Sequence, residues 1–274
     1  MEKLKKILVL ILLFSFCCCK QNIDKKTIPN DKKQEISNND SLNLTNIIDK
    51  SLTLALKNID KNNFETEFKT FVNNQKDSIS TKIAIDNFFS ETQKHLIVET
   101  KTQSAVFLNV FVLEKNSFLP VLSHKELNLE FDKYSLLDVN NDEKKDFLIL
   151  GYASSGCCLK NFATVYLFQK DNSEFSKAFI FINPTFDPKE KIIRGVCYGQ
   201  RGETEMYKYK WNKKSIDTLE YISFEKDKDG INTGNFIKSV KQNHKKLNSK
   251  FIKLNEVPNE YLSIDDYDWF KGDK

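Results

Sequence analysis

The chain has 274 residues, of which 40% are hydrophobic and 29% are charged, with a formal net charge of +4. This length is sufficient for one or two domains with their own cores. Charges of both signs are mixed along the chain and nearly cancel, which argues against a nucleic-acid partner.

The first residues have the pattern of an export signal. A lysine-rich start precedes an apolar run over residues 7–16. A membrane-spanning helix needs about 20 apolar residues, whereas the core of a signal peptide has roughly 7–15. The run is followed directly by three consecutive cysteines, Cys17, Cys18 and Cys19.

A cysteine in this position resembles the lipobox of bacterial lipoproteins, in which the thiol is acylated and becomes the first residue after cleavage. The preceding residue should be small, which favours Cys19, then Cys18, over Cys17, because Cys17 follows Phe16. We therefore expect a lipoprotein signal peptide over residues 1–19. Several acyl chains anchor a protein stably, so the expected location is a membrane surface in the periplasm or at the cell exterior, with the outer membrane favoured. The alternative is an ordinary secretory signal with incidental cysteines.

The next two segments differ in composition. Residues 20–42 are rich in Lys, Asn, Gln, Asp and Ser, which cannot bury enough apolar surface to fold, and they predict a flexible tether. Residues 43–94 carry apolar side chains at three- and four-residue steps, which predicts a helical segment. These side chains are Leu44, Ile47, Ile48, Leu52 and Leu56, then Phe64, Phe68 and Phe71, then Ile83, Ile85, Phe88 and Phe89.

From residue 95 the period becomes two. Short β-rich runs separated by polar turns extend to residue 226, without helix-length segments between them, and this predicts antiparallel pairing. The expected fold class is α+β: a mainly antiparallel β-sandwich or propeller-like body with a short helical N-terminal segment. Residues 227–274 are mixed and polar after a hairpin-type turn at 227–230, and the aromatic end Tyr267-Asp-Trp269-Phe270 is suited to dock as a short tail.

The segment 138–146 predicts a loop that binds a hard cation. Oxygens of Asp138, Asn140, Asp142 and Asp146 occupy positions 1, 3, 5 and 9, and the backbone carbonyl of Lys144 occupies position 7. This is the ligand spacing of a calcium loop, so we expect a structural Ca²⁺ and no organic cofactor.

The loop departs from an EF-hand at two positions. Glu143 stands where Gly usually supplies a positive φ, at a cost of about 1 kcal/mol, and Ile149 stands where a bidentate acid would be. The alternative is an Asx-rich turn without a metal.

Two loops carry the remaining cysteines and a group of contact residues. An oxidising compartment permits a disulfide between Cys158, or its neighbour Cys157, and Cys197; buried thiols are the alternative. The loop at 154–158 should face the loop at 198–202. Ser155, Gly156, Tyr198 and Arg201 are therefore candidate partner-binding residues, and a solvated hairpin tip is the alternative.

Enzyme signatures are weak. The segment 151–156 misses the Gly-x-Ser-x-Gly nucleophile elbow by one residue, and no helix is predicted after it. The three histidines, His95, His124 and His244, lie far apart in the sequence. We therefore expect a protein that is not an enzyme.

Residues 128–224 resemble a family of secreted and periplasmic lipoproteins typified by immunity proteins against lysozyme-like toxins. The resemblance implies an all-β body, a calcium loop, and inhibition of a muramidase by a Ser-Gly-containing loop that enters its cleft; Ser155-Gly156 is in a comparable place. The matching pieces are Asp138-x-Asn140-x-Asp142 with Asp146, Tyr166-Leu-Phe followed by Phe175, Asn183-Pro184-Thr-Phe186-Asp187 with Lys191-Ile192, and Tyr207-x-Tyr209-x-Trp211.

The expected function is a membrane-anchored, protein-binding lipoprotein of the cell envelope, whose partner could be a muramidase. One alternative is a structural or assembly lipoprotein of the outer membrane, which should expose a broad apolar patch. The other is an envelope hydrolase, which should have a cleft joining His95 or His124 to an acid and a nucleophile.

Overall fold

The computed structural model describes residues 38–72, 77–153, 156, 158–169, 174–243 and 250–272. Contacts divide the chain into two units, Met1–Ser41 and Leu42–Lys274, and the fold below is that of the second unit. The expected signal peptide, Cys18, Cys19 and the tether up to residue 37 lie outside the described residues. None of the helices within the described ranges is long and apolar enough to cross a membrane.

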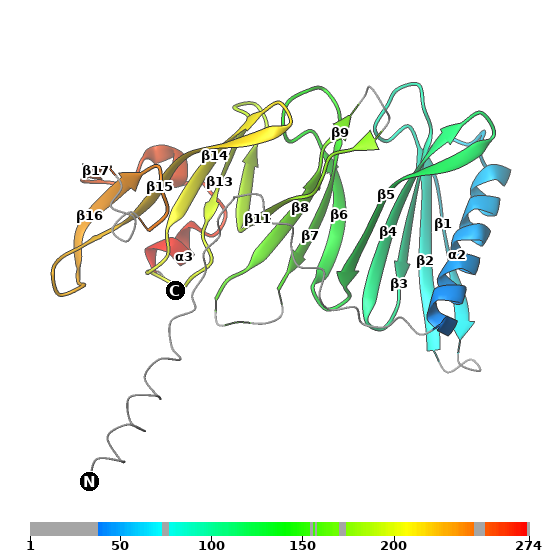
Figure 1. Ribbon diagram of the computed structural model, residues 1–274, viewed down its shortest axis with the longest axis horizontal. Coiled ribbons are helices and arrows are strands. Elements are labelled where there is room, and N and C mark those ends of the chain that lie inside the picture. The colour runs from blue at the N-terminus through cyan, green and yellow to red at the C-terminus, as the bar shows by residue number, and fades with distance from the viewer. Residues whose placement is uncertain are drawn as a thin grey trace, which may run out of the picture. The chain divides into compact units, whose positions relative to one another are not determined.

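The second unit is built mostly of antiparallel sheets with few helices, as the sequence predicted (Figure 1). The first sheet has the order β1-β2-β3-β4-β5, the central sheet β11-β8-β7-β6, and the third sheet β12-β13-β14-β15-β16-β17; β9 and β10 form a separate ribbon. The bounds are α2 (Asn38–Lys57), β1 (Phe64–Val72), β2 (Asp77–Asp86), β3 (His95–Lys101), β4 (Ala105–Glu114), β5 (Ser117–Leu127), β6 (Phe131–Leu137), β7 (Asp146–Tyr152), β8 (Asn161–Tyr166), β9 (Phe168–Gln169), β10 (Glu174–Phe175), β11 (Phe179–Ile182), β12 (Pro184–Asp187), β13 (Ile192–Val196), β14 (Met206–Asn212), β15 (Ser215–Lys226), β16 (Asn232–Ser239), β17 (Phe251–Leu254), η1 (Asn259–Tyr261) and α3 (Tyr267–Lys271).

The sheets pack face to face, in a sandwich-like manner. Ile97 and Val106 of the first sheet share a core with Phe147 and Ile149 of the central sheet. Leu148, between these two on β7, joins a second core with the third sheet. Successive side chains of a strand point to opposite faces. The central sheet is therefore buried on both faces, which explains why β7 is an almost unbroken apolar run.

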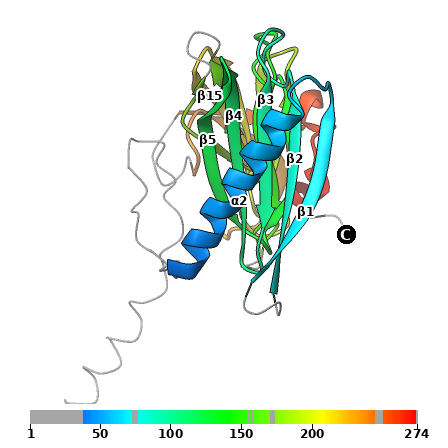
Figure 2. The ribbon, with the colours of Figure 1, turned by 90° about the vertical axis from the view of Figure 1, so that its right-hand side faces the viewer.

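The outer faces of the stack are covered by the two ends of the described chain. Helix α2 lies across the first sheet (Figure 2), and its Ala55 packs with Ile83 and Leu96. On the third sheet, Tyr261 and Phe270 of the C-terminal segment pack on Ile222. Each covering segment buries its apolar side against the sheet and exposes its other side, as amphipathic elements do.

The helical prediction for residues 43–94 is correct only at its start. Helix α2 begins at Asn38, inside the expected tether, and ends at Lys57, and strands β1 and β2 follow. Side chains four residues apart lie on one face of a helix and also on one face of a strand. Phe64 and Phe68 therefore fit both periods, but the structure alternates them with exposed Glu65 and Glu67.

The C-terminal segment is more regular than the sequence indicated. The predicted turn at 227–230 does form: the carboxylate of Asp227 accepts hydrogen bonds from the backbone of Asp229 and Ile231, and Gly230 has φ +83°. Beyond it, β16 and β17 extend the third sheet. The aromatic tail docks, with Phe270 fully buried.

The buried His95 predicts that the folded state loses stability in acid. Its ring lies 5.1 Å from the Phe89 ring and 5.8 Å from the Phe168 ring, and burial lowers its pKa to about 4, partly opposed by the Gln93 backbone. The folded state therefore binds this proton less tightly than the unfolded state, and stability falls as pH drops from about 6.5 towards 4. We expect a loss of about 3 kcal/mol in the free energy of unfolding over this range, measured by urea denaturation.

The matched variant is His95→Leu, which fills the same buried position of β3 with an apolar side chain and removes the titrating group. Its stability should fall less between pH 7 and pH 4 than that of the natural chain. Equal acid sensitivity of the two proteins would contradict the assignment to His95.

Candidate protein-contact site

The two loops predicted to face each other do meet. A Cβ atom placed on Gly156 would lie 2.5 Å from the Tyr198 hydroxyl, and Gly156 has φ +123°. Only glycine accommodates both conditions, so the close approach of the Tyr198 ring depends on it. Ser155 and Cys157, which were predicted beside Gly156, lie outside the described residues.

A third segment, α3, holds the second loop. The indole nitrogen of Trp269 donates a hydrogen bond to the Gly199 carbonyl at 3.0 Å, and the Gly202 amide donates to the Trp269 carbonyl at 2.9 Å. The Arg201 guanidinium lies 5.0 Å above the centre of the Trp269 ring. The loop is thus fixed to a helix whose next residue, Phe270, is buried in the core.

The two loops and α3 carry two cation–ring pairs, which together we call the loop surface: Lys160 with Tyr198, and Arg201 with Trp269. Tyr198 is 36% exposed, and the Lys160 amino group lies 5.6 Å from the centre of its ring. Both aromatic rings carry a cation over one face, an arrangement worth about 0.5–1 kcal/mol at exposed sites. Tyr198 and Arg201 were predicted as contact residues, whereas Lys160 and Trp269 were not.

The loop predicted to bind calcium connects β6 to β7 as an Asx-rich turn. The Asp138 carboxylate accepts hydrogen bonds from the amides of Asp142, at 3.1 Å, and Glu143, at 2.8 Å; that of Asp142 accepts one from Lys144. Glu143 has φ +69°, so it takes the conformation expected of the usual glycine.

Two residues of this loop bear on whether a cation fits. Asn140 is 7% exposed, and its side-chain oxygen is buried without a hydrogen-bond partner. Asp146 is fully buried and accepts hydrogen bonds from Val139 and Phe168; burial raises its pKa to about 7, and the nearby Asp142 and Asp138 add to the rise. The Asn140 oxygen and the carboxylates are ligand types that a hard cation prefers, and its charge would offset that of the acids.

The acidic side chains of the loop are not arranged around a common point as the ligands of a bound metal are. The described residues contain no group of three or more His, Cys, Asp or Glu side chains arranged to hold a metal. Asp146 directs both carboxylate oxygens to backbone amides, and it therefore joins Val139 of the loop to Phe168 of β9. The carboxylate oxygens of Asp138 and Asp142 also accept hydrogen bonds within the loop, from backbone amides of residues 142–144 and from the Asn140 side chain.

The predicted bridge between Cys158 and Cys197 is not formed. Both side chains are buried, and no disulfide joins them. Cys197 packs in the core beside Val139 and Tyr207, and burial raises the pKa of its thiol. A buried thiol behaves as a small apolar side chain, so Cys197 follows the alternative reading of the sequence.

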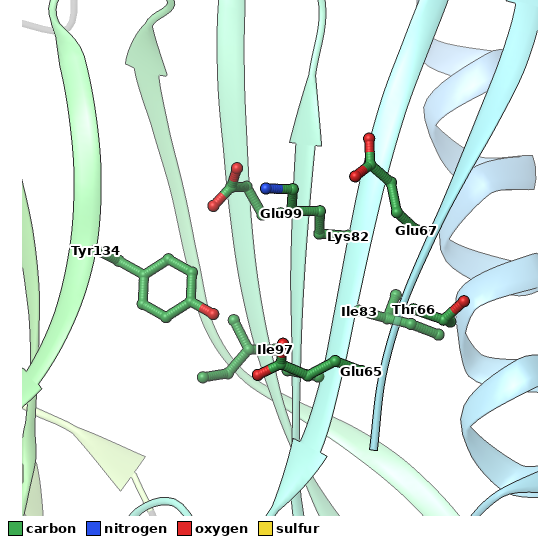
Figure 3. A pocket seen from close by; sticks show the side chains of 9 residues that line it. Glu65, Thr66, Glu67, Lys82, Ile83, Ile97, Glu99 and Tyr134 are labelled. Atoms are coloured by element: carbon green, nitrogen blue, oxygen red, sulfur yellow. The ribbon is translucent and has the colours of Figure 1, made fainter. Parts of the chain in front are cut away.

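A cleft of about 470 Å³ lies between β1–β3 and β6 (Figure 3). Its charged side chains are Glu65, Glu67, Lys82 and Glu99, and the ring of Tyr134 reaches into it from the opposite side. Burial raises the Tyr134 pKa to about 12, with Glu99 and Glu65 contributing. The phenol is therefore protonated at neutral pH and suited to hydrogen bonding.

His124 does join an acid and a hydroxyl. Its ring nitrogens lie 2.8 Å from the Tyr166 hydroxyl and 3.4 Å from the Glu126 carboxylate. Burial opposes ionisation of Glu126, yet the His124 contact lowers the pKa of this carboxyl. Burial and Glu126 raise the pKa of Tyr166. The hydrogen bond between His124 and Tyr166 links β5 to β8, and the raised pKa keeps the phenol protonated at neutral pH.

Comparison with known proteins does not identify a family for this chain. No protein-family model matches the chain, and no curated protein matches it. A solved structure titled "Structure of a Xanthomonas Type IV Secretion System related protein" is similar over 69% of this chain and 93% of that chain, with 11% identity and a TM-score of 0.32. A likeness at this score carries no argument about function.

Proposed function

We propose that the chain is a lipid-anchored lipoprotein of the cell envelope that binds another protein, without catalysis, through the loop surface. The observation that carries this proposal is the convergence of Tyr198, Arg201 and Trp269 from two separate segments. Tyr, Trp and Arg are the side chains enriched among residues that dominate binding energy in protein interfaces.

The loop surface is also held in place before any partner arrives. Hydrogen bonds tie Gly199 and Gly202 to Trp269, and Gly156 leaves room for the Tyr198 hydroxyl. Preorganisation lowers the entropy that must be lost on binding. More narrowly, we propose that the partner is a muramidase. The support is the resemblance of residues 128–224 to immunity proteins against lysozyme-like toxins, in which Ser155-Gly156 lies where the inhibitory loop would be.

The experiment is a binding and inhibition assay with the full-length chain against a panel of purified muramidases. The double variant Tyr198→Ala with Arg201→Ala should weaken capture and inhibition by at least about tenfold, because each truncation at an interface centre costs about 1–2 kcal/mol. Phe71→Ala is the matched control, since Phe71 is an aromatic residue of β1 that is 63% exposed. Unchanged inhibition in the double variant would remove the loop surface from the mechanism.

Lipid anchoring is tested separately. The double variant Cys18→Ala with Cys19→Ala should release the protein from membranes, because acyl chains supply the attachment. The measurement is the fraction that stays in the membrane pellet after a carbonate wash. A variant that pellets as fully as the natural chain would refute anchoring through these thiols.

We also propose a structural Ca²⁺ in the 138–146 loop. Calcium should raise the melting temperature, since a ligand at about a hundred times its Kd adds about 2.7 kcal/mol of stability. Asp138→Ala should abolish the calcium-dependent rise, whereas Asp217→Ala on β15 should keep it. A melting temperature that is the same in calcium and in EDTA would reject the ion.

One observation favours the alternative of an assembly lipoprotein. Strand β17 ends the third sheet, and Phe251 and Ile252 on it are 50% and 59% exposed. Apolar side chains on a terminal strand suit the addition of a strand from another chain. Under this alternative, capture of outer-membrane proteins would depend on Ile252 and be unaffected by the Tyr198 and Arg201 substitutions.

A further inference from the structure

A second concave site lies between the central sheet and the third sheet. It has a volume of about 660 Å³ and is lined by β6, β7, β8, β12 and residues 265–266. Its apolar part includes Leu137, Leu148 and Leu150, of which Leu137 is 40% exposed. We call this site the groove. Its volume is within the range of about 300–1,000 Å³ that is usual for binding pockets.

The charged side chains that line the groove are all acids. They are Asp132, Asp265 and Asp266, and the described residues that line the groove include no lysine or arginine. Burial raises the Asp266 pKa and Asp265 adds to the rise, whereas the hydrogen bond from Asn161 opposes it. The groove thus combines apolar surface with negative charge that nothing in its lining neutralises.

The acidic wall of the groove is held rigidly. Asn161 donates a side-chain hydrogen bond to the Asp266 carboxylate at 3.1 Å, and the Asp265 amide donates to the Thr185 hydroxyl at 2.8 Å. These bonds attach the segment before α3 to β8 and β12. The Asp266 carboxylate and the backbone of Asp265 are therefore held in place at the groove.

We propose that the groove binds an extended peptide segment of a partner protein in which lysine or arginine alternates with apolar residues. Successive side chains of an extended peptide point to opposite sides, so one side can contact Leu137 and Leu150 while cationic groups reach Asp132 and Asp265. Charge complementarity with the three acids carries the choice of a cationic ligand. The proposal does not rest on the loop surface, because it involves different side chains.

The test is fluorescence anisotropy with the full-length chain and a fluorescein-labelled peptide that alternates lysine with leucine. We expect binding that weakens as salt is raised, since salt screens exposed charges. The double variant Asp132→Asn with Asp265→Asn should weaken binding about tenfold. The matched control is Glu65→Gln with Glu67→Gln, which removes the same charge from the cleft at β1 and should leave the affinity unchanged.

Several results would overturn the proposal: no binding of the lysine peptide, equal binding of a peptide that alternates glutamate with leucine, or equal affinity of the groove variant and the natural chain. Preferential binding of a peptidoglycan-derived glycan would instead assign the groove to a sugar. Asp265→Asn alone guards against misfolding, because this side chain is exposed; it should weaken binding about threefold. Tyr198→Ala with Arg201→Ala should leave peptide binding intact, which separates this test from that of the proposed function.

Discussion

Replacing Phe270 by alanine should lower the free energy of unfolding by about 3–5 kcal/mol, the usual cost of truncating a buried Phe. Phe270 is fully buried, and its ring stacks on Phe224 with centres 4.7 Å apart and planes at 12°. It is the main apolar attachment of α3 to the third sheet. Urea denaturation of the natural chain and the variant measures the effect.

The same substitution should also disturb the loop surface. Trp269 precedes Phe270 on α3 and accepts and donates the hydrogen bonds that hold Gly199 and Gly202. The control is Leu262→Ala, in the same C-terminal segment but 50% exposed, which should cost less than about 1 kcal/mol. Similar destabilisation by both variants would contradict the anchoring role of Phe270.

Asn183→Ala should cost about 3–5 kcal/mol, because it breaks the polar connection between the central and third sheets. The Asn183 side chain donates to the carbonyls of Leu159 and Val196 and accepts from the Asn161 amide, and only 1% of the residue is exposed. Each buried group left without a partner costs about 1–3 kcal/mol. Asn183 also has φ +46°, a conformation that asparagine tolerates better than alanine.

Two further variants separate these causes. Asn183→Asp keeps an acceptor for the Asn161 amide but loses the donor, so it should also be strongly destabilising. Asn128→Ala removes an amide with a single, exposed side-chain contact and should change stability by less than about 0.5 kcal/mol. Thermal and urea denaturation of the natural chain and the three variants measure these differences in stability. A mild effect of Asn183→Ala would mean that the Asn183 side chain adds little to the junction of the two sheets, which the Asn183 backbone and the Tyr207 hydroxyl also hydrogen-bond.

The sequence predicted strands correctly where an apolar run was consistent with a strand and not with a helix. The runs at 105–113, 147–150 and 206–211 are strands, because their β-branched and aromatic residues fit a buried sheet and nothing else at that length. The helical prediction was wrong at Phe64 and Phe68 because their four-residue spacing fits both a helix and a strand. Strands β16 and β17 were missed because each is held mainly by its neighbour in the sheet, β16 by β15 and β17 by β16, and most of their side chains are not buried.

The site was predictable only in part, for a physical reason. Turn residues and aromatic side chains indicated the loops of Gly156 and Tyr198, but local sequence does not encode the contact between residue 201 and residue 269. Trp269 reaches Arg201 because Phe270 docks on the third sheet. The disulfide prediction failed because cysteine spacing does not reveal that Cys197 points into a core.

The most direct test of the proposed function is a photo-crosslinking amino acid placed at Tyr198 in the full-length chain, with a second placement at Phe71 as the reference. We predict a crosslink between position 198 and a purified muramidase that the chain inhibits, lost when Arg201 is also replaced by alanine, and no such product from position 71. Inhibition without any crosslink at position 198, or equal crosslinks from both positions, would contradict binding through the loop surface.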